Sequence, residues 1–123
     1  MAPLRITTDV DMDGVAILGP AGNLDADTSE DLTRAVTAVL TRHRVTHLVV
    51  DLLRVSSLDP VALDTLLGAR ATALQAGASF RVMRPHHTVR RVLHLAGTCQ
   101  LLMHGRLPAA RSGPTGMTNG TIQ

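Results

Sequence analysis

The chain has 123 residues, of which 45% are hydrophobic, and this predicts one globular domain with an ordinary core. All twelve basic residues are arginine and the formal net charge is only +2, a weak basis for binding nucleic acid. Phe80 is the only aromatic residue, so the chain lacks the Trp and Tyr side chains that stack on bases or anchor interfaces. We therefore expect no direct nucleic-acid partner.

The cysteine content and the hydropathy of the chain indicate in which cellular compartment to expect the protein. Cys99 is the only cysteine, which excludes an intramolecular disulfide, and we expect it to be a small apolar filler. No signal peptide is apparent, and no apolar run approaches the ~18 residues that a membrane-spanning helix needs. We expect a soluble cytoplasmic protein without a membrane partner.

The first elements predict a hairpin. Leu4 to Val10 is expected to be a strand, residues 11–14 (Asp-Met-Asp-Gly) a turn, and Val15 to Leu18 a second strand. The Gly and Pro residues within 19–22 are expected to end that strand.

A helix is predicted after Gly22-Asn23-Leu24-Asp25, with Asp27 or Thr28 as its N-terminal cap. Apolar residues recur there at intervals of three and four, the stripe expected to pack on a sheet. They are Leu32, Ala35, Val36, Val39 and Leu40. Basic residues 42–44 are expected to end the helix in solvent.

The most apolar strand candidate runs from Val45 to Leu52. It lacks alternation, which is typical of a central strand covered on both faces. Asp51, at its end, is expected to accept hydrogen bonds from loop N–H groups. A loop with Ser56 and Ser57 follows, and then a helix from about Pro60 to Gly77. The expected buried side of this helix is Val61, Leu63, Leu66, Leu67, Ala71 and Leu74.

The last elements complete an alternating order. Ala78 to Met83 predicts a strand, residues 86–95 a third helix ended by Gly97, and Leu101 to Met103 a short strand or helical turn. Residues 105–123 predict a disordered tail, which leaves residues 1–104 as the domain. The order predicts an α/β domain with a four- to five-stranded, mostly parallel sheet, an N-terminal β-hairpin and helices packed on the sheet.

The chain shows no catalytic pattern. It has no phosphate-cradling Gly-rich loop and no zinc-ligand spacing, so we expect neither cofactor nor metal. His86 and His87 are adjacent, and on a helix their side chains diverge by roughly 100°. Ser57, a histidine and Asp59 could be combined as a nucleophile, base and acid, but almost any chain allows such a choice. We do not expect an enzyme.

Asp59-Pro60 has a local explanation. Asp is a favoured N-cap, and Pro fits the first helical position, where its missing N–H costs nothing. On composition alone, a structural role at the start of the helix is favoured over a functional one.

Several segments, in this order and spacing, resemble the STAS domain of sulfate transporters and anti-sigma factor antagonists. They are Gly22-Asn23-Leu24-Asp25, Val49 to Val55, Leu58 to Leu63, Ala76-Gly77 and Val89 to Gly97. The similarity covers roughly Leu4 to Met103. It implies a small α/β domain that acts by binding.

In the antagonist branch, the resemblance implies an anti-sigma factor partner that is also a serine kinase of the GHKL ATPase type. Unphosphorylated antagonist holds this kinase and frees the sigma factor. Phosphorylation of the serine directly after the loop aspartate ends the interaction, and a phosphatase restores it. A phosphate brings about −1.5 to −2 charge to a helix N-terminus, enough to abolish docking.

This chain departs from that pattern at the switch. The family motif is close to D-S-S-G-L, and here the residues are Asp59-Pro60-Val61-Ala62-Leu63. Pro60 therefore occupies the phospho-acceptor position and has no hydroxyl to modify. The resemblance predicts a module that this modification does not switch, unless Ser57 or Thr65 serves as an alternative acceptor.

The resemblance also assigns a partner-binding face. Asp25 and Asp59 match family aspartates that lie near each other beside that face. The further expected contacts are Ser56, Ser57, Pro60, Val61, Asp64 and Arg70. Homo- or hetero-oligomers with other STAS proteins, a scaffold subunit of a STAS assembly, and a domain that binds nucleotides or other small ligands are the alternatives.

Overall fold

The computed structural model describes residues 4–95, 97, 102 and 103. Its elements, in chain order, are β1 (Arg5–Val10), β2 (Val15–Leu24), α1 (Ser29–Arg42), β3 (His47–Asp51), β4 (Val55–Leu58), α2 (Pro60–Gln75), β5 (Ser79–Met83) and α3 (His87–Leu95). Cys99 and the predicted tail at 105–123 lie outside the described residues. No helix within the described ranges is long and apolar enough to cross a membrane.

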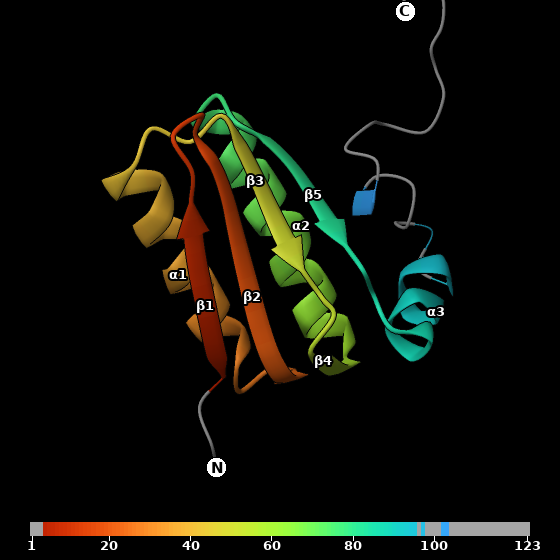
Figure 1. Ribbon diagram of the computed structural model, residues 1–123. Helices are drawn as coiled ribbons and strands as arrows, with labels where there is room; N and C mark the ends of the chain where they lie inside the picture. The colour runs from red at the N-terminus through yellow and green to blue at the C-terminus, as the bar shows by residue number, and fades with distance from the viewer. Residues whose placement is uncertain (1–3, 96, 98–101, 104–123) are drawn as a thin grey trace, which may run out of the picture.

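The sheet has five strands and confirms the predicted class. β1 and β2 form the antiparallel hairpin, and β3 and β5 continue from β2 in parallel, in the order β1-β2-β3-β5. β4 pairs in parallel with the far end of β2, on the edge that β3 occupies farther up (Figure 1). The sheet is therefore mostly parallel, with a hairpin at its N-terminal edge.

The core lies between this sheet and the helices α1 and α2, which cover one face (Figure 1). The strand residues on that face are at most 3% exposed: Ala16, Leu18, Leu48, Val50, Phe80 and Val82. From α1, the core receives Leu32, Val36 and Val39, with Ala35 and Leu40 at its margin, so the predicted stripe is confirmed. Full burial of each such large side chain stabilises the fold by about 1.5–3 kcal/mol.

The other face of the sheet carries no helix of the described part of the chain. Among the described residues, helices thus cover β3 on one face, whereas the sequence predicted cover on both. Val49 points to that face and is nevertheless only 6% exposed. Its apolar run reflects a centre strand crowded by its neighbours on both sides, Ile17 and Arg81, rather than a second helix layer.

β2 runs six residues beyond its predicted end at Leu18, through the Gly and Pro residues expected to end it. Pro20 is tolerated because pairing with β3 stops at Leu18 and pairing with β4 resumes at Gly22. Between these points no strand on that edge requires the N–H that proline lacks. The Gly22 N–H then donates to the carbonyl oxygen of Arg54 at 2.9 Å.

β4 was not predicted, because its four residues are few and do not alternate between buried and exposed positions. Val55 and Leu58 are buried, whereas Ser56 and Ser57 between them are exposed. The buried side of α2 also differs from the prediction: Leu63 and Leu66 are buried as expected, but small residues fill the remaining contact positions. Those residues are Ala62, Ala69 and Ala73, and they leave Val61 and Leu74 about half exposed.

The last elements agree with the predictions to within two residues. α2 ends at Gln75, and Gly77 follows with φ +84°. α3 begins at His87 rather than His86, and Gly97 has φ +72° beyond its end. Of the predicted Leu101 to Met103 element, Leu102 and Met103 are described and helical, and Leu102 is buried in the core.

Candidate functional site

The N-terminus of α2 begins directly where β4 ends. Asp59 has extended backbone angles and caps the helix, with its Oδ1 accepting the Ala62 N–H at 2.8 Å. Pro60 occupies the first turn, where no intrahelical N–H is required. The local explanation drawn from sequence is confirmed.

Asp59 also connects two segments that are far apart in sequence. Its Oδ2 accepts the Ala26 N–H at 3.2 Å, and its own N–H donates to the carbonyl oxygen of Leu24 at 3.2 Å. The loop before α1 is thereby held against the start of α2. Asp25 and Asp59, matched separately by the resemblance, lie at one site.

The loop before α1 is organised by Asp25. Its Oδ1 accepts the N–H groups of Asp27 and Thr28 at 3.0 and 3.1 Å. Thr28 is the N-cap residue of α1, as one of the two predictions had it, but its side chain makes no capping bond. Its hydroxyl instead donates backwards to the carbonyl oxygen of Asn23 at 2.7 Å. The carboxylate of Asp25 therefore serves the loop rather than projecting from it.

The two serines of β4 differ in their surroundings. Ser56 and Ser57 are both exposed, on a strand rather than in the predicted loop. The Ser57 hydroxyl donates to Oδ1 of Asn23 at 3.0 Å. Ser57 thus joins β4 to the end of β2 at the same place where Asp59 binds the loop before α1.

The first turns of α2 present the exposed part of the site. Pro60, Val61 and Asp64 are all exposed, and the Val61 side chain is 49% exposed. Arg70 lies ten positions after Pro60, about 15 Å farther along the helix, and is partly buried. It was expected to be an exposed partner contact on this helix, and it lies apart from the residues at the helix N-terminus.

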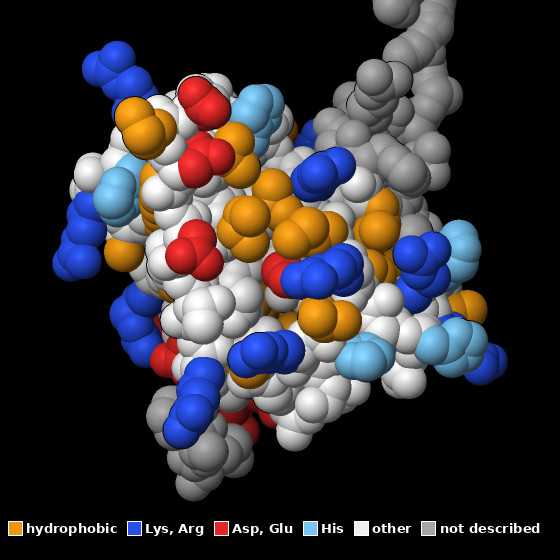
Figure 2. Space-filling view, viewed as in Figure 1, with side chains coloured by type: hydrophobic (Ala, Val, Ile, Leu, Met, Phe, Trp, Pro, Cys, Tyr) orange, Lys and Arg blue, Asp and Glu red, His pale blue; other side chains and the backbone are white. Residues whose placement is uncertain are grey.

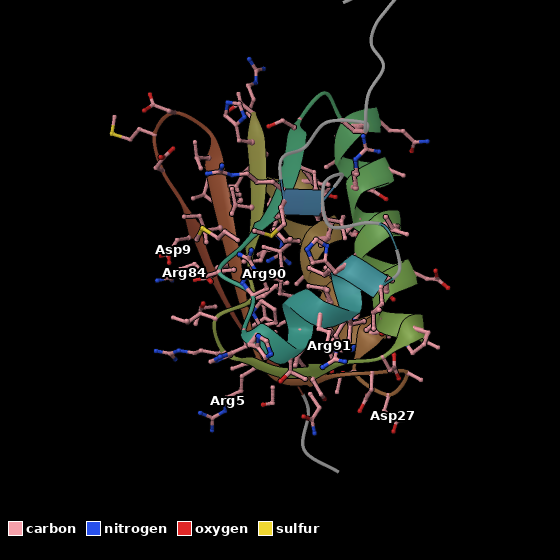
Figure 3. The ribbon with its side chains drawn as sticks, turned by 90° about the vertical axis from the view of Figure 1, so that its right-hand side faces the viewer. Arg5, Asp9, Asp27, Arg84, Arg90 and Arg91 are labelled. Atoms are coloured by element: carbon pink, nitrogen blue, oxygen red, sulfur yellow. The ribbon has the colours of Figure 1, made fainter. Side chains whose placement is uncertain are left out.

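α3 supplies a rim to this site that the sequence reading did not assign. It packs against β4 with Val89 and Leu93 buried, which turns Arg90 and Arg91 to solvent. Figure 3 shows Arg91 at the same end of the molecule as Asp27. In the sequence, Arg90 and Arg91 lie between the apolar residues Val89 and Leu93, and helical spacing puts the two arginines on a different side of α3 from that apolar pair. Only the packing of α3 on β4 shows which site they border.

The loop between β3 and β4 is fixed by an ion pair. Arg84 donates from its guanidinium to both carboxylate oxygens of Asp51, with Nε 3.2 Å from Oδ1. This hydrogen bond is the main reason why the pKa of Asp51 lies below its usual value. Oδ1 also accepts the Leu53 N–H at 3.1 Å, which confirms the expected loop contact. Arg84 has φ +53°, an uncommon conformation for a residue with a side chain.

The arrangement consists of exposed groups at the N-terminus of α2 and a frame of hydrogen-bonded loops beside them. The carboxylates of Asp25 and Asp59 are both occupied by backbone N–H groups, so their chemical role is to hold the loops in place. The exposed groups are a proline ring, the Val61 side chain, the Asp64 carboxylate and, from α3, Arg91. Such a mixture of apolar and charged groups suits contact with another protein.

Comparison with known proteins agrees with this description. The family profile described as "Mlab, STAS domain" matches residues 8–104. Among solved structures, an anti-sigma factor antagonist from Mycobacterium paratuberculosis is 33% identical, with a TM-score of 0.63 over 76% of this chain and 79% of that one. A search of curated proteins found no match.

Two further structures share the fold at lower identity. A proposed anti-sigma factor antagonist from Thermotoga maritima has a TM-score of 0.69 at 21% identity, covering 80% of this chain and 83% of its own. The unphosphorylated Bacillus anti-sigma factor antagonist SpoIIAA has a TM-score of 0.66 at 19% identity, covering 80% and 85%. The match over residues 8–104 and the Mycobacterium relative together establish that this chain belongs to the STAS domain family.

Proposed function

We propose that the protein is an anti-sigma factor antagonist-like binding module whose partner is an anti-sigma factor of the GHKL serine kinase type. Three observations support this: the family, the 33% identical antagonist, and a framed, exposed helix N-terminus at the place where the resemblance puts the partner-binding face. The docking surface consists of Ser56, Ser57, Pro60, Val61 and Asp64, with Asp25 and Asp59 as its frame.

The observation that carries the regulatory part of the proposal is Pro60. It lies exposed in the first turn of α2, at the position that the resemblance gives to the phospho-acceptor, and it has no hydroxyl. Of the two alternative acceptors, Ser57 donates its hydroxyl to Asn23, and Thr65 donates its hydroxyl to the carbonyl oxygen of Val61 at 3.1 Å. The module therefore docks constitutively, without the covalent off-signal of its relatives.

The docking surface is tested by a matched pair of substitutions on α2. Val61 and Leu74 are 49% and 47% exposed, at opposite ends of the same helix. We expect Val61→Arg to weaken binding to a cognate kinase at least about tenfold, because it puts a charge into a desolvated contact, whereas Leu74→Arg leaves binding unchanged. Calorimetric titration of each variant against the kinase measures this. Equal effects of the two substitutions would contradict the assigned surface.

The regulatory claim is tested by mass spectrometry after incubation with the kinase and ATP. We expect no phosphate on the native chain and one phosphate on the variant that carries both Pro60→Ser and Ala62→Gly. Phosphate on Ser57 or Thr65 of the native chain would disprove constitutive docking. If the double variant binds the kinase but stays unmodified, Pro60 does not occupy the acceptor position. Tight nucleotide binding without kinase binding would instead favour a ligand-binding STAS domain.

A further inference from the structure

The face of the sheet opposite α1 and α2 has an ordered pattern of charge. The pairing register places Asp9 of β1, Ile17 of β2, Val49 of β3 and Arg81 of β5 in one row across the sheet. All four side chains point away from the helices, because residues at alternate positions fill the core. The row is thus acidic at one edge, apolar in the middle and basic at the other edge. Figure 2 shows this face, with hydrophobic side chains gathered between charged ones.

The charges that end this row have no partner in the described chain. Asp9 and Arg81 are exposed, and neither forms an ion pair with another described residue. They are separated by three strand spacings, about 14 Å, which is too far for them to pair with each other. Each is therefore available to a group that approaches the face.

The next row on this face is polar in both halves of the sheet. On the β1 and β2 side, Gly19 pairs with Thr7, whose Oγ1 fills the space beside it, 2.6 Å from where a Cβ of residue 19 would lie. On the β3 and β5 side, Arg84 folds over Asp51 as an ion pair. Figure 3 shows Arg84 and Asp9 on the same side of the sheet, away from α2. When the register is continued by one residue, Gly19 lies level with Asp51. Polar groups therefore lie at the same level in both halves of the face, Thr7 beside Gly19 and Arg84 beside Asp51.

We propose that this face binds a second copy of the chain, face to face, about a two-fold axis parallel to the strands. This axis lays β1 of one copy over β5 of the other and β2 over β3. Asp9 then faces the second copy's Arg81, Ile17 faces its Val49, and Gly19, with Thr7 beside it, faces its Asp51. Each contact occurs twice, as an isologous interface requires. Stacked sheets of this kind pack about 10 Å apart, with strands within about 30° of alignment.

The charge pattern selects this axis over the alternative. A two-fold axis perpendicular to the strands would put Asp9 against Asp9 and Arg81 against Arg81, which is unfavourable. A partner with a different fold would not be expected to repeat an acidic, apolar and basic row in reverse order. Self-complementarity therefore favours a second copy.

The dimer leaves the proposed docking surface free. α2 lies on the opposite side of the sheet, so the helix N-termini of the two copies are on the outer layers (Figure 1). The open face is about 20 Å across four strands and ~13 Å along them, small for a stable interface. The dimer is therefore weak, is favoured at high protein concentration, and weakens as salt screens its ion pairs.

Sedimentation of the full chain across a wide concentration range, from about 10 to 500 µM, tests this proposal. We expect a concentration-dependent dimer for the native chain. Asp9→Arg and Arg81→Glu should each weaken self-association at least about fivefold, since each replaces two attractive contacts with two repulsive ones. Arg42→Glu, at the end of α1 on the other side of the molecule, makes the same change of charge as Arg81→Glu and should have no effect.

Two further measurements distinguish loss of the proposed contact from loss of folding. The chain carrying both Asp9→Arg and Arg81→Glu restores opposite charges across the axis and should dimerise again. An equimolar mixture of the two single variants should form heterodimers, because the introduced arginine then meets the introduced glutamate, and the unchanged Arg81 meets the unchanged Asp9. A native chain that stays monomeric at all concentrations, or a dimer that survives both single substitutions, overturns the proposal. Failure of the mixture to associate, with both variants folded by circular dichroism, does so as well.

Discussion

The carboxylate of Asp59 binds two backbone N–H groups that are remote from each other in sequence. One oxygen accepts the N–H of Ala62 in the first turn of α2, and the other accepts the N–H of Ala26 in the loop before α1. A residue that the sequence explains as a helix cap is therefore also the connection between the two loops of the candidate site. The same side chain starts α2 and fixes the distance from α2 to its neighbouring loop.

Replacing Asp59 with alanine should lower the free energy of unfolding by about 1–3 kcal/mol, because it removes the cap and leaves the Ala26 N–H without its acceptor. Asp59→Asn should cost less, since an amide oxygen can still accept from Ala62 but its NH₂ group cannot accept from Ala26. Urea denaturation of the three proteins measures these differences. Equal stability of the alanine variant and the native chain would show that Asp59 does not hold the loops.

Replacing Arg84 with glutamine should destabilise the chain in a pH-dependent way. Because Arg84 lowers the pKa of Asp51 in the folded state, the pair stabilises the fold above the unfolded pKa, about 4. That contribution is lost as the pH falls through the lowered folded pKa. We therefore expect a reduced urea midpoint for Arg84→Gln at pH 7, and a difference from the native chain that shrinks as the pH falls through the lowered pKa of Asp51 and is small below it.

A matched control for this measurement is Arg91→Gln, which removes an exposed arginine that forms no ion pair among the described residues. Its effect should be small throughout this pH range. Glutamine keeps the backbone at residue 84 as unfavourable as arginine does, so the comparison isolates the charge. A destabilisation by Arg84→Gln that stays constant as the pH is lowered from 7 until the Asp51 carboxylate is protonated would rule out that carboxylate as its source.

The elements that the sequence predicted well are those whose pattern is local. The stripe on α1 and the Asp59-Pro60 start of α2 depend on residues a few positions apart, and both are confirmed. The errors occur where a distant partner decides. Pro20 stays in β2 because β3 and β4 leave a gap beside it, and β4 exists because β2 is there to pair with it. No local pattern contains that information.

The candidate site likewise has one part that was expected from the sequence and another that depends on tertiary packing. The resemblance brought Asp25 and Asp59 to one place, and their loops do meet there through the Ala26 N–H. Arg91 was not assigned to the site, because only the packing of α3 on β4 brings it to that end of the molecule. The row from Asp9 to Arg81 is likewise a property of strand register, which spans residues from four segments.

Gly14 offers a test of how tightly the hairpin turn is fitted against the start of β3. It has φ +86°, and its carbonyl oxygen accepts the Thr46 N–H at 2.8 Å. A Cβ at this position would lie 2.8 Å from the backbone oxygen of Arg44. Gly14→Ala should therefore add a steric clash with main-chain atoms to the usual cost of a positive φ, about 1 kcal/mol.

Gly77 separates these two costs. It also has a positive φ, +84°, but a Cβ there would have nothing within 4 Å. Gly77→Ala thus measures the conformational cost alone, and Gly14→Ala should exceed it by about 1–3 kcal/mol in chemical denaturation. The backbone around Arg44 and Thr46 cannot move freely, because Gly14 and Thr46 are joined by the hydrogen bond that aligns β2 with β3. Equal losses of stability for the two variants would mean that this loop moves to accommodate the added methyl group. The register of β2 and β3 would then not depend on the turn.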